Sequence, residues 1–151
     1  MATDHPEPGE RASRGPGDAD FDRLAAARYV LLTTFRRDGT PVATPVWTVV
    51  DGDRLLVLTG AASGKVKRLR REPRVLLAPC RARGQRTGTD VEGRAHLLPA
   101  DVGPAVLQGL ADRYRLQFHA LRLGEGLLRR LRRAPAPQEA FLELRVTGGA
   151  G

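Results

Sequence analysis

The stretch of sequence that decides the fold covers residues 29–59 and reads YVLLTTFRRDGTPVATPVWTVVDGDRLLVLT. Its β-branched, aliphatic and aromatic segments are separated by Asp38-Gly39 and Asp51-Gly52, and an Asp-Gly pair readily adopts the positive φ of a tight hairpin turn. The pattern predicts three antiparallel strands, over residues 29–35, 42–50 and 54–59. Pro41 and Pro45 cannot donate ladder hydrogen bonds, so we expect the middle strand at a sheet edge or bulged near its start.

Three further strands are predicted downstream, over residues 75–80, 90–98 and 140–146. Helical spacing of apolar residues predicts helices over 21–27, from Ser63 to Arg71 and over 102–118, with a basic helical segment at 121–133. Six short strands with early hairpins and inserted helices indicate a mainly β protein, built as a small six-stranded barrel. In a chain of 151 residues this is one domain, over 19–147, between a disordered tail at 1–18 and a frayed end at 148–151.

Several classes of protein are disfavoured by composition. No apolar run is long enough to cross a membrane, and the N-terminal residues have no apolar signal region, so we expect a cytoplasmic chain. Cys80 is the only cysteine and the three histidines are scattered, so we expect neither an intramolecular disulfide nor a metal site. Without a nucleophile beside a base, no catalytic side chain for hydrolysis is predicted.

The formal net charge of +8 is concentrated in two segments. Residues 63–74 hold six basic residues and one acidic residue, and residues 112–133 hold seven basic and two acidic, so each segment carries +5. Strong basicity in a small protein indicates an anionic partner, such as a nucleic acid, a lipid surface or a phosphorylated ligand.

The first basic segment has an unusual position, because its cations lie where a helix begins. The start of a helix is effectively positive and exposes unpaired N–H groups, yet Lys65, Lys67 and Arg68 follow the expected cap Ser63. A bound phosphate resolves this concentration of positive potential, whereas the alternative is a basic face in water. Gly60–Lys65 is not a P-loop, since its spacing is one residue short and Val66 cannot bind magnesium.

These segments together resemble a known family. The strand at 29–34 with its Asp-Gly turn, PVATPVW at 41–47, SGKVK at 63–67, PRV at 73–75 and VEGRA at 91–95 look like the pyridoxamine 5'-phosphate oxidase-like proteins. The closest branch is the one described as PPOX-class F420-dependent oxidoreductases. The resemblance covers about residues 20–147.

The resemblance implies a flavin-reductase-like split β-barrel, also called the FMN-binding split barrel, that forms a homodimer with the cofactor in a groove between subunits. It implies that the ring lies along the strand at 43–48 and that the phosphate is held by the segment at 59–68. The cofactor-binding residues it implies are Thr44, Pro45, Val46, Trp47, Thr59, Ser63, Gly64, Lys65, Lys67 and Arg68. Trp47 fits either a place beside the cofactor ring or a place in the core.

The resemblance further implies hydride transfer between reduced coenzyme F420 and a small organic acceptor, with the cofactor supplying the reactive atom. FMN-using oxidases of this kind carry an arginine at the position of Gly64 and a glutamine near the position of Gly88. This chain lacks both side chains, and their loss favours the deazaflavin F420 with its anionic tail. An FMN-dependent oxidoreductase and a non-catalytic deazaflavin carrier stay open as alternatives.

The second basic segment, residues 112–133, interleaves seven arginines with six leucines. We expect a helix packed on the barrel or on a partner subunit, with its arginines in water. Contacts with an anionic membrane surface or with the cofactor tail stay open. Scarce aromatic residues disfavour single-stranded nucleic acid, so a nucleic-acid-binding barrel is a remote alternative and we expect no nucleic-acid partner.

Overall fold

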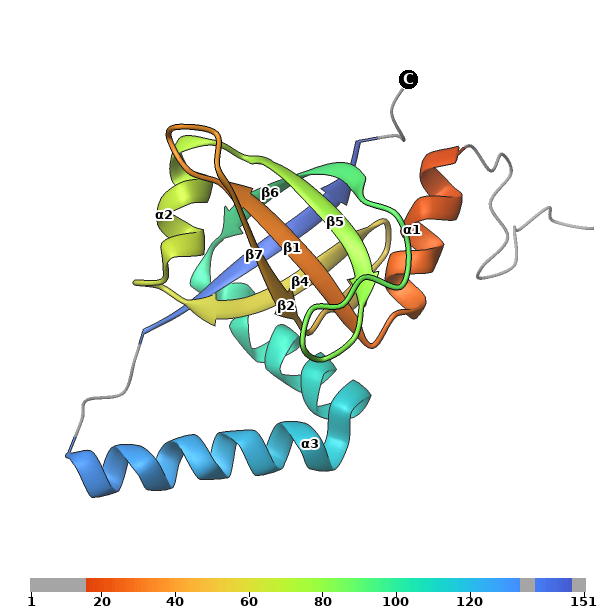
Figure 1. Cartoon of the computed structure of the whole chain (residues 1–151). Helices are drawn as coiled ribbons and strands as arrows, with labels where there is room; N and C mark the ends of the chain where they lie inside the picture. Colours follow the sequence, from red (N-terminus) through yellow and green to blue (C-terminus); the bar gives the residue numbers. More distant parts are fainter. Residues whose placement is uncertain (1–15, 134–137, 148–151) are drawn as a thin grey trace, which may run out of the picture.

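The computed structural model describes residues 16–133 and 138–147, which form one coiled antiparallel sheet with helices around it (Figure 1). The seven strands run in the spatial order β2-β1-β5-β6-β7-β4-β3. Their bounds are β1 Tyr29–Phe35, β2 Pro41–Val46, β3 Val49–Asp51, β4 Arg54–Gly60, β5 Arg74–Cys80, β6 Val91–Leu98 and β7 Glu139–Val146. The mainly β class and the split-barrel architecture predicted from the sequence are confirmed.

The sheet has seven strands, one more than predicted, because the expected strand over 42–50 is interrupted at Trp47 and Thr48. β2 pairs with β1 at one edge of the sheet, whereas β3 pairs with β4 at the other. Between them, the Thr48 N–H donates to the Tyr114 hydroxyl at 3.2 Å, and the Thr48 carbonyl accepts from Arg113 Nη1 at 3.2 Å. A helix therefore binds the backbone where a strand was expected, and the chain crosses from one sheet edge to the other.

The hairpin turns and the edge position of β2 agree with the sequence. Gly39 and Gly52 have φ values of 88° and 62°, the left-handed conformation that a glycine adopts without strain. β2 is an edge strand, as Pro41 and Pro45 indicated. One side of its backbone therefore faces no neighbouring strand.

The described chain has three apolar clusters: one inside the barrel, one beneath a helix, and a small one of Leu31, Ala78 and Cys80. Because successive strand residues point to opposite faces, Val57 packs into the first cluster and Leu56 into the second. The first cluster includes Leu32, Leu77 and Leu142, all fully buried. The second joins the sheet to the helix α3 (Gly103–Arg132), which follows a short 3-10 turn, η1 (Ala100–Val102).

Two shorter helices cover other parts of the barrel. α1 spans Pro16–Ala26, so it begins before the predicted Phe21 and takes in the last residues of the expected tail at 1–18. Proline is favoured in the first turn of a helix, which explains the earlier start. The rest of that tail and the expected frayed end at 148–151 lie outside the described residues. α2 spans Gly64–Arg71 and lies against β1 and β6, with Val66 and Leu69 buried as predicted.

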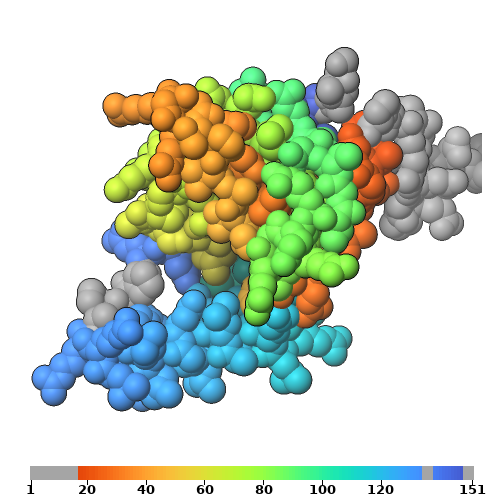
Figure 2. All heavy atoms as spheres, in the orientation of Figure 1, coloured from red at the N-terminus to blue at the C-terminus, as the bar shows by residue number. Residues whose placement is uncertain are grey.

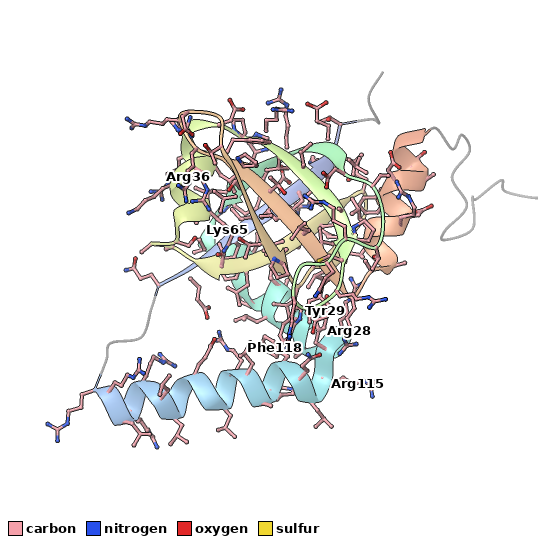
Figure 3. All side chains as sticks on the ribbon, in the orientation of Figure 1. Arg28, Tyr29, Arg36, Lys65, Arg115 and Phe118 are labelled. Carbon is pink, nitrogen blue, oxygen red and sulfur yellow. The ribbon has the colours of Figure 1, made fainter. Side chains whose placement is uncertain are left out.

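α3 merges the helix predicted at 102–118 with the basic segment at 121–133, but it is sharply kinked. Arg115 has φ 41° and ψ −114°, outside the helical region, at the point where the helix changes direction (Figure 3). Before the kink, Val106, Leu110 and Tyr114 pack on the sheet. Beyond it, the helix runs below the barrel and much of its apolar surface is exposed (Figure 1).

Candidate cofactor-binding site

A cavity of about 1000 Å³ lies between the barrel and the part of α3 beyond the kink. Figure 2 shows the helix standing off the barrel on this side of the molecule. Its barrel wall includes Pro45, Val46 and Trp47 from the end of β2 and Leu58 and Thr59 from β4. The volume lies within the range typical of small-molecule and cofactor sites.

Trp47 lies at the point where the chain leaves β2, and aromatic neighbours fix its indole ring. The ring stacks on Tyr114, with centroids 4.6 Å apart and planes 12° apart, and Phe118 lies at 6.3 Å. Tyr114 is itself held, because its hydroxyl donates to the Arg28 carbonyl at 2.9 Å. Trp47 therefore packs against the α3 cluster and also lines the cavity, and contact with a cofactor ring stays a prediction.

The start of α2 forms the polar end of the cavity. Ser63 caps the helix through its hydroxyl, which accepts from the Val66 N–H at 3.4 Å, and lies 3.4 Å from the Thr59 hydroxyl. Lys65 follows in the first turn and lines the cavity. Within residues 16–133 and 138–147, Lys65 has no ion-pair partner. Partial burial lowers the pKa of its ammonium group, and the charge of Arg68 lowers it further.

Two more arginines strengthen the positive potential near Lys65. The Arg68 guanidinium folds back over Gly64 and donates from Nε to the Thr34 hydroxyl at 2.6 Å. Burial lowers the pKa of Arg68, as does the charge of Arg36 from the β1–β2 turn. Arg36 and Lys65 lie on the α2 side of the barrel in Figure 3. Arg36 was not among the predicted site residues, because only the fold brings this turn close to α2.

The helix wall of the cavity carries both apolar and charged groups. Leu121 and Leu128 supply the apolar part, and Arg122, Glu125 and Arg129 the charged part. Arg122 forms an ion pair with Glu139 at the start of β7. The sequence of 112–133 predicted a packed helix with its arginines in water, whereas Arg122 and Arg129 line the cavity. The direction of this helix depends on the kink at Arg115, for which the sequence carries no signal.

The structure brings together half of the residues predicted to bind a cofactor. Those that line the cavity are Pro45, Val46, Trp47, Thr59 and Lys65. Ser63, Gly64 and Arg68 adjoin it through the α2 start, Thr44 lies one residue further into β2, and Lys67 is exposed on α2. Tyr29, Leu110 and Phe118 also line the cavity and were not predicted, because strand and core patterns mark such residues only as apolar.

Three further features of the described residues bear on other kinds of site. No three His, Cys, Asp or Glu side chains among those residues are grouped closely enough to hold a metal ion. Burial raises the pKa of the Cys80 thiol, which is 6% exposed, in agreement with a small buried apolar residue. Within the same residues, no helix is long and apolar enough to cross a membrane.

Known proteins share the fold of this chain. The family model described as pyridoxamine 5'-phosphate oxidase matches residues 18–148. No curated protein matches the chain. Among solved structures, a conserved hypothetical protein from Mycobacterium tuberculosis is 21% identical with a TM-score of 0.62, covering 91% of this chain and 84% of that one.

Two further solved structures share the fold. A protein described as an F420 reductase is 20% identical with a TM-score of 0.56, covering 85% of this chain and 94% of that one. An FMN-binding protein related to pyridoxamine 5'-phosphate oxidase, from Nostoc punctiforme, is 20% identical with a TM-score of 0.52, covering 85% and 75%. At these identities the likeness establishes the shared fold.

Proposed function

The chain belongs to the pyridoxamine 5'-phosphate oxidase family, and from that premise we propose that it is an oxidoreductase that transfers a hydride between reduced coenzyme F420 and a small organic acceptor. The observation that carries the proposal is that Lys65 lines the same cavity as Pro45, Val46 and Trp47. A cation for a phosphate and an apolar strand end for a flat ring thus share one cavity. These are the two contacts that a phosphorylated deazaflavin requires.

The residues present fit such a cofactor. Pro45, Trp47 and Leu58 offer apolar and aromatic surface, and β2 has one backbone side free of a partner strand. Lys65 is a partly buried ammonium group without an ion-pair partner in the described chain, and a phosphate would restore its lowered pKa. Ser63 and the first N–H groups of α2 lie at the start of the helix that carries Lys65.

The choice of F420 over FMN is supported by two glycines and two arginines. At Gly88, an added Cβ would lie 2.7 Å from Cγ of the buried Pro79, so a glutamine does not fit there without moving the strand. Gly64 supplies no side-chain cation of its own. In addition, Arg122 and Arg129 line the cavity on the α3 side, where they suit the anionic tail of F420.

When bound, the deazaflavin ring would supply the hydride chemistry, and the chain's own residues would supply position and shielding. Stacking on Tyr114 fixes Trp47 as a rigid wall. Lys65 would hold the phosphate end, and Arg122 and Arg129 the tail. The apolar surfaces of Leu58, Leu121 and Leu128 would exclude water from the ring.

FMN remains a second candidate because of one specific contact. The Arg68 guanidinium lies over Gly64, with Nη1 2.6 Å from where a Cβ of residue 64 would be. It therefore places an arginine beside the position at which FMN-using oxidases carry one. The fold does not choose between the two cofactors, because it is shared by an F420 reductase and an FMN-binding protein.

The experiment that tests the function is a turnover assay. Purified chain and reduced F420 are mixed with a panel of unsaturated and nitro-substituted acceptors, and oxidation of the deazaflavin is followed by absorbance. We expect at least one acceptor to be reduced in proportion to enzyme, and the Lys65→Ala variant to lose this activity. Saturable F420 binding with no single-turnover oxidation by any acceptor would instead identify a carrier and overturn the enzymatic proposal.

A further inference from the structure

The part of α3 beyond the kink, residues 116–132, is named here the distal helix. It turns away at Arg115 and runs along the underside of the barrel in Figures 1 and 2. The side of this helix that faces the barrel lines the cavity, with Leu121, Arg122, Glu125, Leu128 and Arg129. Because the helix repeats every 3.6 residues, its opposite side points away from the barrel.

The side that points away from the barrel is apolar. It carries four leucines, Leu116, Leu123, Leu127 and Leu131, which are 85%, 77%, 58% and 74% exposed. Their separations of seven, four and four residues place them in one row along the helix. These four residues are named the leucine face. Soluble proteins rarely expose an apolar row of this kind, and where one occurs it usually marks a binding surface.

An open groove lined by arginines adjoins the leucine face. Its volume is about 730 Å³, and it is named the arginine groove after its lining residues, which are Arg122, Leu123, Gly126, Leu127, Arg129, Arg130 and Arg133. Leu123 and Leu127 belong both to the groove and to the leucine face. Because Gly126 has no side chain, the groove reaches the helix backbone there. Cationic and apolar groups thus lie side by side on the distal helix.

Several cations of the groove are available to an external anion. Residues 116–133 contain five arginines and one acidic residue, Glu125, which lines the cavity instead. Arg122 pairs with Glu139 at the start of β7. In the part of the chain that the structure describes, three other arginines of the groove form no ion pair, namely Arg129, Arg130 and Arg133. Charge complementarity at this groove therefore calls for an anionic partner.

A row of leucines beside arginines matches the two layers of an anionic lipid bilayer, in which acyl chains lie directly beneath phosphates. A second distal helix would cover the leucines but would bring more arginines, and its one acidic residue lines a cavity. We propose that the distal helix binds the surface of an anionic phospholipid bilayer, with the leucine face in the acyl region and the arginine groove on lipid phosphates. Guanidinium groups suit this role because they donate two parallel hydrogen bonds to phosphate oxygens.

The proposal is tested by flotation of the full chain with vesicles of phosphatidylcholine and phosphatidylglycerol in equal parts, and with vesicles of phosphatidylcholine alone. We expect the anionic vesicles to bind at least tenfold more tightly, since each arginine near an anionic surface contributes on the order of fivefold. The double variant Leu123→Gln/Leu127→Gln should bind at least tenfold more weakly, because it loses apolar burial. A chain that binds neither kind of vesicle, or a double variant that binds as tightly as the unmodified chain, overturns the proposal.

A matched pair of charge variants tests the arginine groove. Arg130→Gln/Arg133→Gln removes two cations that line the groove but not the cavity. The control Arg70→Gln/Arg83→Gln removes two exposed cations from elsewhere in the chain. We expect binding to the anionic vesicles to weaken at least tenfold for the first variant and less than threefold for the control. Equal losses would assign the binding to net charge and contradict a site on the distal helix.

A fluorescent label reports which part of the molecule enters the lipid. An environment-sensitive dye is attached at Leu127→Cys or, as the control, at Arg70→Cys on α2, and the buried Cys80 of the unmodified chain gives the background. We expect anionic vesicles to shift the emission at residue 127 to shorter wavelength and to leave that at residue 70 unchanged. Equal shifts at the two positions, or none at residue 127, would refute the proposed orientation.

Sedimentation equilibrium without lipid distinguishes a lipid surface from a protein partner. We expect Leu123→Gln/Leu127→Gln to keep the oligomeric state of the unmodified chain, and its circular dichroism spectrum to stay that of the folded chain. A lower oligomeric state in the variant would overturn the proposal in favour of a second copy on the leucine face. None of these measurements needs a cofactor, so a chain that binds F420 but no vesicles contradicts this inference and leaves the proposed function standing.

Discussion

Lys65 is the residue on which the proposed cofactor site depends most. Its ammonium group lines the cavity, whereas Lys67, two residues on, is exposed on the other side of α2. Loss of a hydrogen bond to a charged group costs about 1.5–3 kcal/mol, so Lys65→Ala is expected to weaken cofactor binding about 10- to 150-fold. The control variant Lys67→Ala removes the same charge from the same helix and is expected to change affinity less than about threefold. Titration of each variant with the cofactor measures the two affinities.

An equal loss in the two variants would assign the effect to net charge alone and remove Lys65 from the site. Lys65 and Lys67 both lie in the first turn and a half of the same helix, so the sequence alone does not distinguish them. Only the fold separates them, since helical geometry turns residues 65 and 67 to different sides.

Arg115 carries the backbone strain at the kink that sets the direction of the second part of α3. Its φ of 41° and ψ of −114° are unfavourable for any residue with a Cβ. We expect Arg115→Gly to stabilise the chain by about 1 kcal/mol, because the strain it relieves exceeds the entropic cost of a glycine. Urea unfolding measures the change. Arg115→Ala, which keeps the Cβ, should show no such gain, and a glycine variant less stable than the alanine variant would contradict the kink.

At the scale of the elements, the sequence predicted most strands and their turns but missed the break at Trp47 and Thr48. The hairpin turns, the edge position of β2 and the cap at Ser63 depend on local chemistry, which the residues themselves carry. The break depends on Tyr114 and Arg113, which bind the backbone of Thr48 from more than sixty residues away. No pattern within 42–50 could reveal that partner.

The candidate site likewise has one part that the sequence predicted and one part that it did not. Residues near a turn or a helix start, such as Lys65 and Pro45, were predicted through local motifs and the family resemblance. The α3 wall was not, because its place opposite the barrel follows from one strained residue. The sequence indicated a helix with arginines and leucines there, but not which side faces the cavity.

Strands β4 and β7 are joined by an ion-pair network that makes stability depend on pH. Partial burial alone would raise the pKa of Glu143, but hydrogen bonds from Arg54 and Arg145 hold it below its ordinary value. The stabilisation is therefore fully present above the ordinary pKa of a glutamate and is lost as pH falls through the lowered value in the folded chain. We expect Glu143→Gln to be less stable than the unmodified chain at pH 7 and to differ from it less in acid. Urea unfolding from pH 7 to about pH 3 measures this, and a constant difference across that range would contradict the assignment.

At the scale of the whole molecule, the two basic segments contribute three cations to one cavity, which Glu125 and Glu139 also line. Lys65 lies at its barrel end, and Arg122 and Arg129 lie along its helix wall. The two basic segments, about fifty residues apart in the sequence, thus meet across the same space. In the proposed function, these three cations lie where the anionic groups of the cofactor would bind.

A salt titration tests that arrangement. Attraction between the cavity and an anionic cofactor is screened by salt, so we expect F420 affinity to fall as ionic strength rises from about 0.05 to 0.5 M. Removing the two cavity arginines in Arg122→Gln/Arg129→Gln should flatten this dependence. Arg130→Gln/Arg132→Gln changes the charge of the same helix equally, away from the cavity lining, and should leave the slope near that of the unmodified chain. Equal slopes for the two double variants would contradict a role for the helix wall.

The most direct test of the central claim uses Trp47, the only tryptophan of the chain, which lines the cavity. A flat cofactor ring bound there should quench its fluorescence, so titration with coenzyme F420 and with FMN gives both affinities from one signal. We predict saturable quenching by F420 with a dissociation constant at least ten times lower than that for FMN. Saturable quenching by FMN at low concentration, with none by F420, would contradict the account.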